Sequence, residues 1–116
     1  MKVVINKCYG GFGLSHEAIV KYTHLSGMTL IFEERESSLI QYSYYIASEN
    51  DKNEFFHDGQ IARDDPNLIK VIEQLGPLAN GRFSKLSIVE IPDDIEWSVE
   101  EYDGNEWVAE KHRIWS

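Results

Sequence analysis

A glycine-rich segment near the N-terminus has the residue types of an anion-binding loop. Gly10, Gly11 and Gly13 follow a run of β-branched residues and precede Ser15, which is favoured at the start of a helix. A junction between a strand and a helix presents backbone N–H groups and the positive end of the helix dipole to an anion. The spacing matches neither common phosphate loop, because His16 stands at the last glycine position of one and no lysine follows for the other.

Two interpretations of this segment stay open. Glycine most often only allows an unusual backbone conformation, which favours a tight structural turn. The alternative is a site for a nucleotide-like anion, whose phosphate an arginine from elsewhere in the chain would bind. Arg63 stands next to Asp64 and Asp65, so a local helix cap and ion pair compete for it. The residues of this possible ligand site are Gly10, Gly11, Phe12, Gly13, Ser15, Arg63 and Arg113.

Nucleophile and metal chemistry have little support in the sequence. Cys8 is the only cysteine, so the chain forms no disulfide within itself. A thiolate near a helix start is a possible nucleophile, with His16 or His112 as its base, but a free cysteine is more often simply buried. The histidines are scattered and no cysteine pair exists to hold a metal. We therefore expect no catalytic residue, no metal and no cofactor.

Charge is distributed unevenly along the chain. The protein has 11 Lys and Arg against 20 Asp and Glu, which gives a formal net charge of −9. Nucleic-acid binders usually carry a basic surface, so we expect no direct binding to nucleic acid. Residues 86–110 contain no Lys or Arg, although many of them are acidic. If these acids share one face, that face would fit a basic groove on a partner protein. The alternative is a solvated sheet face that only keeps the protein in solution.

The predicted protein interface combines acidic residues with one aromatic anchor. Its residues are Asp93, Asp94, Glu96, Glu100, Glu101, Asp103, Glu106 and Trp115. Trp97, Trp107 and Tyr102 are further candidates for aromatic anchors of this interface. For Trp97 and Trp107 we favour packing in the core, since large aromatic side chains dominate the cores of small domains.

Start and stop signals predict two helices that would position these residues. Ser15 is predicted to cap the first helix, which ends at Gly27. Asp65 is predicted to cap the second helix, with Pro66 as its first residue and Gly76 at its end.

Apolar and β-branched runs predict the strands. Residues 48–59 are polar and are expected to form a loop. An Asp-Gly pair at Asp103 and Gly104 predicts a terminal hairpin. The predicted strands are residues 3–5, 28–32, 39–47, 86–91, 97–102 and 106–112.

The length of 116 residues fits a single domain covering residues 1–116. Strands interleaved with two helices predict the α+β class. We expect a mostly antiparallel sheet of about five to six strands with two helices packed on one face.

Motifs at both ends of the chain carry a resemblance to a known family. CYGGFGLS occurs near the N-terminus, and IPDDIEW, EEYDG and EWVAEKHR occur near the C-terminus. These sequences resemble those of small proteins encoded by tailed phages and prophages, whereas residues 26–62 contain no matching motif. The resemblance implies a phage-linked accessory protein in a bacterial cytoplasm, and it transfers no catalytic residue.

The leading hypothesis is a non-enzymatic accessory protein that binds a bacterial host protein, such as a defence component, through an acidic C-terminal hairpin. The alternative is a binder or sponge for a small nucleotide-like anion at the glycine-rich loop. The N-terminus has no apolar signal region, and no run approaches the roughly 18 apolar residues of a membrane span. We therefore expect a location in the host cytoplasm and no membrane contact.

Overall fold

The computed structural model describes residues 1–34, 42–48 and 53–111, and it has an α+β fold with antiparallel strands and two helices. The predicted fold class is confirmed. The helices are α1 (His16–Leu25) and α2 (Pro66–Leu75), with short 3₁₀ turns at η1 (Asp58–Gln60) and η2 (Gly76–Ala79). The strands are β1 (Lys2–Asn6), β2 (Leu30–Glu34), β3 (Tyr42–Ile46), β4 (Glu54–Phe56), β5 (Leu86–Glu90), β6 (Trp97–Tyr102) and β7 (Asn105–Glu110).

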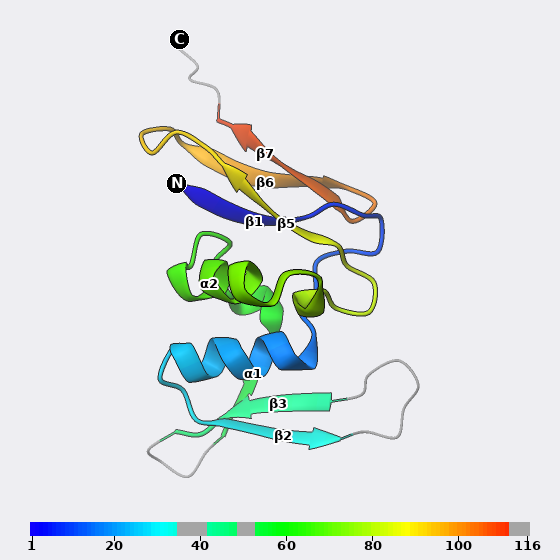
Figure 1. Cartoon of the computed structure of the whole chain (residues 1–116), viewed down its shortest axis with the longest axis vertical. Helices are drawn as coiled ribbons and strands as arrows, with labels where there is room; N and C mark the ends of the chain where they lie inside the picture. Colours follow the sequence, from blue (N-terminus) through cyan, green and yellow to red (C-terminus); the bar gives the residue numbers. More distant parts are fainter. Residues whose placement is uncertain (35–41, 49–52, 112–116) are drawn as a thin grey trace.

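The two helices form a layer between two groups of strands (Figure 1). The β1–β5 pair lies against α2, and the β6–β7 hairpin lies beyond that pair. The sheet with the order β2-β3-β4 lies at the other end of the molecule, against α1. The expected single sheet of about five to six strands with both helices on one face is therefore wrong in its arrangement. The reason is that α1 buries apolar side chains on two sides, toward α2 and toward the three-stranded sheet.

Both helices begin and end as their sequence signals predict. The Ser15 hydroxyl accepts a hydrogen bond from the Ala18 N–H at 3.1 Å, and the Asp65 carboxylate accepts one from the Asn67 N–H at 2.8 Å. Gly76 ends α2 with φ of 54°, a conformation that favours glycine. Neither described helix is long and apolar enough to cross a membrane.

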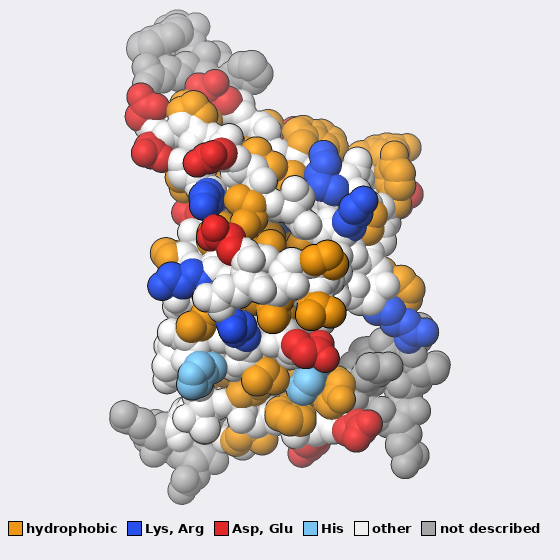
Figure 2. Space-filling model, in the orientation of Figure 1, with side chains coloured by type: hydrophobic (Ala, Val, Ile, Leu, Met, Phe, Trp, Pro, Cys, Tyr) orange, Lys and Arg blue, Asp and Glu red, His pale blue; other side chains and the backbone are white. Residues whose placement is uncertain are grey.

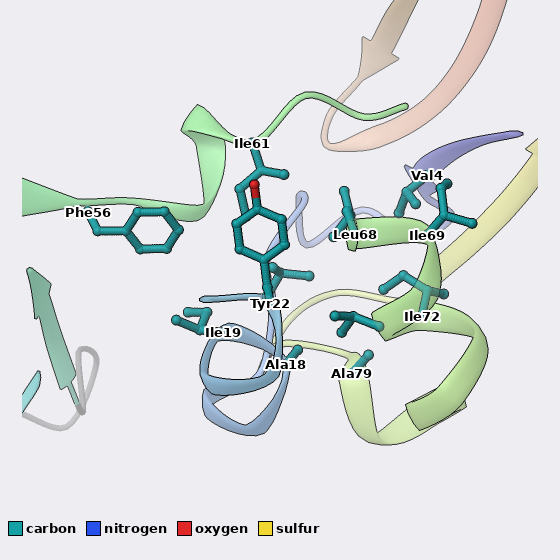
Figure 3. Close-up of a cluster of buried hydrophobic side chains, with 12 residues drawn as sticks. Val4, Ala18, Ile19, Tyr22, Phe56, Ile61, Leu68, Ile69, Ile72 and Ala79 are labelled. Atoms are coloured by element: carbon teal, nitrogen blue, oxygen red, sulfur yellow. The ribbon is translucent and has the colours of Figure 1, made fainter. Parts of the chain in front are cut away.

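The core joins β1, both helices and the segment before α2 (Figure 3). Val4 and Leu68 are fully buried where β1 meets α2. Tyr22 of α1 stacks on Phe56 of β4, with ring centroids 6.3 Å apart, and its hydroxyl donates to Asp65 Oδ2 at 2.7 Å. This tyrosine therefore links the three-stranded sheet to the cap of α2.

The predicted loop at residues 48–59 contains a strand, so that prediction is wrong. Residues Glu54–Phe56 form β4, which pairs with β3. Phe56 is buried in the core, whereas Phe55 on the opposite face is exposed. The polar composition of this segment indicates a loop, but Phe56 packs against α1. Strand formation depends more on such packing than on local propensity, so the segment forms a strand.

The remaining predicted strands are present where the structure describes them, with ends that differ from the predicted ones by at most two described residues. The hairpin of β2 and β3 is present, while residues 39–41 of its predicted second strand lie outside the described residues. β6 and β7 pair around a tight turn, in which Asp103 and Gly104 have φ of 51° and 89°. Two consecutive positive φ angles are typical of the turn that the Asp-Gly pair predicts. Residue 112 of the predicted last strand also lies outside the described residues.

Candidate functional site

A buried ion pair fastens the C-terminal hairpin to the free edge of β1. Arg63 Nη1 donates to Glu106 Oε1 at 2.6 Å, and Nη2 donates to Oε2 at 2.8 Å, so the contact is bidentate. Glu106 Oε1 also accepts a hydrogen bond from the Asn6 N–H at 2.8 Å. The Val4 N–H donates to the Arg63 carbonyl at 2.8 Å. The backbone of β1 that does not face β5 thus finds its partners in these two residues instead of in another strand.

The predicted phosphate clamp at Arg63 is therefore committed to a structural contact. Its guanidinium carbon lies 3.6 Å from the centroid of the Phe12 ring, so Phe12 covers one side of it. Glu106 was predicted to be an exposed interface residue, and this is wrong, since its side chain is only 8% exposed. The guanidinium of Arg63 neutralises this buried carboxylate, so Glu106 adds no negative charge to the surface of the hairpin.

Glycines of the N-terminal segment allow close backbone packing. A Cβ on Gly10 would lie 1.8 Å from the Phe83 carbonyl oxygen, and one on Gly104 would lie 2.6 Å from the Gly11 nitrogen. These contacts agree with the interpretation of the segment as a tight structural turn.

The place at the start of α1 where an anion would bind is occupied by a carboxylate of the protein itself. The Leu14 N–H donates to Asp58 Oδ2 at 2.9 Å, and the Ser15 hydroxyl donates to the Leu78 carbonyl at 2.7 Å. The Ser15 N–H donates to the Ala79 carbonyl at 2.9 Å. A carboxylate at this helix end stands where a phosphate would bind. Arg113, the other predicted ligand residue, lies outside the described residues.

The acidic residues of the C-terminal part do not share one face. Asp93, Asp94 and Glu96 are exposed on the connection between β5 and β6, and Asp103 is exposed at the hairpin turn. Glu100 and Glu101 are neighbours on β6 and so point to opposite faces of the hairpin. Figure 2 shows acidic side chains gathered at the end of the molecule that carries the hairpin.

One acid of this group is partly neutralised. Asp93 forms an ion pair with the amino group of Met1, and this hydrogen-bonded contact holds the pKa of the Asp93 carboxyl below its usual range.

The outer face of the β6–β7 hairpin combines exposed aromatic side chains with one acid. Glu100 pairs directly across the hairpin with Trp107, and Tyr102 lies two residues along the same face. Tyr102 is 73% exposed and Trp107 is 41% exposed. The prediction that Trp107 packs in the core is therefore wrong, while Trp97 on the inner face is half-buried. Trp115 lies outside the described residues.

The alternation of residues in a strand explains why Trp107 lies outside the core. Glu106 binds Arg63 on the inner face, so its neighbour Trp107 must point outward. Tyr102 and Trp107 become members of one surface only through the register of the hairpin. The signal available in the sequence was the period of two, counted from the Asp103-Gly104 turn.

A second feature is an open pocket of about 860 Å³ between the start of α1 and the three-stranded sheet. His16 stacks on Tyr42 with ring centroids 4.1 Å apart, and its Nδ1 lies 2.9 Å from the Tyr44 hydroxyl. Burial raises the pKa of Tyr44 to about 12, with smaller contributions from Tyr42, Asp58 and Glu17. The Tyr44 hydroxyl therefore stays protonated at neutral pH.

Metal binding has no support in the described part of the chain, where no group of three His, Cys, Asp or Glu side chains converges. None of the protein-family models, curated proteins or solved structures compared with the chain matches it. The resemblance to proteins of tailed phages and prophages thus stays a prediction from the motifs.

Proposed function

We propose that the protein is a non-enzymatic binding protein that attaches to a basic surface of a partner protein through the outer face of its C-terminal hairpin. The observation that carries the proposal is the exposure of Tyr102 and Trp107 on one face, together with Glu100. Exposed aromatic side chains of this size are enriched among the residues that dominate binding energy. The motif resemblance implies that the partner is a bacterial host protein.

Charge supports a basic partner. Residues 86–110 contain no Lys or Arg, and the exposed acids surround the hairpin on its connection and at its turn. The negative electrostatic potential of these acids attracts a positively charged surface and raises the association rate at low salt. Among the acids of β6 and β7, only Glu100 lies on the aromatic face itself, so the other acids would steer the approach and form the polar rim.

The experiment is affinity purification from bacterial lysate, followed by binding measurements with the purified partner at low and high salt. The double variant Tyr102→Ala/Trp107→Ala should weaken binding at least about tenfold, as expected for two central aromatic contacts. Raising the ionic strength should slow association, because it screens the exposed acids.

Phe55→Ala provides the matched control. Phe55 is 58% exposed on β4, and the sheet of β2, β3 and β4 lies at the opposite end of the molecule from the hairpin (Figure 1). Loss of binding in the hairpin variant but not in this control supports the proposal. Equal binding by both variants, or no protein partner at low salt, contradicts it.

A further inference from the structure

Two lysines are neighbours where β1 ends and β5 begins. The Lys7 N–H donates to the Lys85 carbonyl at 2.7 Å, one residue beyond the last pair of the β1–β5 register, Asn6 and Leu86. The Lys85 N–H donates to Asn6 Oδ1 at 2.8 Å. The backbones of the two lysines therefore lie side by side. Both lysine side chains are exposed.

This proximity is unfavourable by itself, because like charges close together repel each other. Neither lysine forms an ion pair with a carboxylate within residues 1–34, 42–48 and 53–111. The protein has 20 Asp and Glu residues, so acidic partners are abundant in the chain. An anion bound between the two ammonium groups would relieve their repulsion.

Exposed aromatic rings flank the lysine pair. Tyr9 is 67% exposed and Phe83 is 59% exposed, each two residues from one of the lysines. The two segments are held together by the Cys8 thiol, which donates to the Phe83 carbonyl at 3.1 Å, and by the absence of a side chain on Gly10. Figure 2 shows Lys and Arg side chains beside hydrophobic ones at the upper right of the molecule, where β1 ends in Figure 1.

We propose that Lys7, Lys85, Tyr9 and Phe83 form a site for a nucleotide, either free or within a single strand of nucleic acid. The ammonium groups bind the phosphate, and a base stacks on an exposed ring. The guanidinium carbon of Arg82 lies 5.4 Å from the centroid of the Phe83 ring.

Net charge argued against this class of ligand, but the tertiary structure separates the charges. The lysines lie at one end of the β1–β5 pair, whereas Asp93 and Asp94 follow the other end of β5. Exposed charges more than about 8 Å apart are largely screened at physiological salt, so the local field decides binding. Asp103 is the exception, because Gly104 of its turn packs on the Tyr9 carbonyl.

The test is fluorescence anisotropy of the full chain with a labelled single-stranded oligonucleotide of about ten nucleotides. Lys7→Gln and Lys85→Gln should each weaken binding about tenfold. Each should also reduce the slope of the logarithm of the binding constant against the logarithm of the salt concentration by about one. Phe83→Leu should weaken binding about tenfold without changing the salt dependence. Asp103→Asn should tighten binding, and Asn tolerates the positive φ at this position.

Lys70→Gln on α2 is the matched control, since Lys70 is exposed on another element. Competition with a nucleoside monophosphate, with inorganic phosphate and with a poly-glutamate peptide identifies the ligand. Competition by the monophosphate assigns a free nucleotide, and oligonucleotide binding that the monophosphate does not compete for assigns a single strand.

A second readout separates binding from folding. Lys85→Gln should raise the midpoint of urea unfolding or leave it unchanged, because it removes a like-charge contact. The proposal is overturned if the oligonucleotide and the monophosphate both fail to bind, or if Lys70→Gln has the same effect as Lys85→Gln. Equal competition by inorganic phosphate also overturns the proposal, because it shows that no base stacks on the rings. Binding of poly-glutamate alone overturns it too, because the ligand is then an acidic protein segment.

Discussion

Arg63 and Glu106 are joined by two hydrogen bonds, of 2.6 and 2.8 Å, across 43 positions of the sequence. Glu106 also accepts the Asn6 N–H, and Arg63 Nη1 lies 3.3 Å from the Val4 carbonyl. Side chains thus take the role that a neighbouring strand would have along this edge of β1. The position of the hairpin, and with it the outer aromatic face, depends on this pair.

Glu106→Ala should strongly destabilise the protein. It leaves the guanidinium of Arg63 without its carboxylate and the Asn6 N–H without an acceptor, and breaking one side of a buried pair costs about 3 kcal/mol or more. The free energy of unfolding, measured in urea, checks this. Glu101→Ala is the control, because Glu101 pairs with Glu106 across the hairpin but is exposed, and it should change stability by about 0.5 kcal/mol or less. Similar losses for both variants would contradict the role of the ion pair.

Gly10→Ala and Gly13→Ala should differ, although they change the same loop. The new methyl group at Gly10 would meet the Phe83 carbonyl oxygen at 1.8 Å, which forces the two segments apart. The nearest atom to a methyl group at Gly13 would be 3.9 Å away. We expect Gly10→Ala to lower the melting temperature and Gly13→Ala to leave it unchanged or raised, since alanine also restricts the unfolded chain. An unchanged melting temperature for Gly10→Ala would show that this close approach is unimportant.

Asp65→Ala should destabilise α2 and its contact with α1 together. The carboxylate accepts hydrogen bonds from the Asn67 N–H and the Tyr22 hydroxyl, so its loss removes a helix cap and leaves a buried hydroxyl without its acceptor. A loss of about 2 kcal/mol is expected from chemical denaturation. Tyr22→Phe in the Asp65→Ala background should then cost little more, and a large additional loss would contradict the coupling.

Alkaline pH should destabilise the protein through Tyr44. Its pKa is raised to about 12 in the folded protein from 10.0, so the unfolded chain loses the proton first as the pH rises. The unfolded state then binds fewer protons between these two values, and stability decreases with pH in this window. The free energy of unfolding measured from pH 9 to pH 12 should fall less for Tyr44→Phe than for the unchanged protein. Parallel curves for the two proteins would rule out this contribution.

Local chemistry made several elements predictable from the sequence. Ser15 and Asp65 cap helices because their side-chain oxygens accept the backbone N–H groups that no helical carbonyl reaches. The Asp103-Gly104 turn is equally local, since both residues tolerate positive φ. These interactions span only a few residues, so the residue types on either side determine them.

Contacts between distant segments decided the rest. The sequence alone determined an α+β domain with two helices, a terminal hairpin and an acidic C-terminal part. Only the tertiary structure decided that Glu106 is buried while Trp107 is exposed, because the strand faces depend on where Arg63 meets the hairpin. It likewise placed Lys7 beside Lys85, since strand register is set by packing between residues far apart in the chain and not by composition.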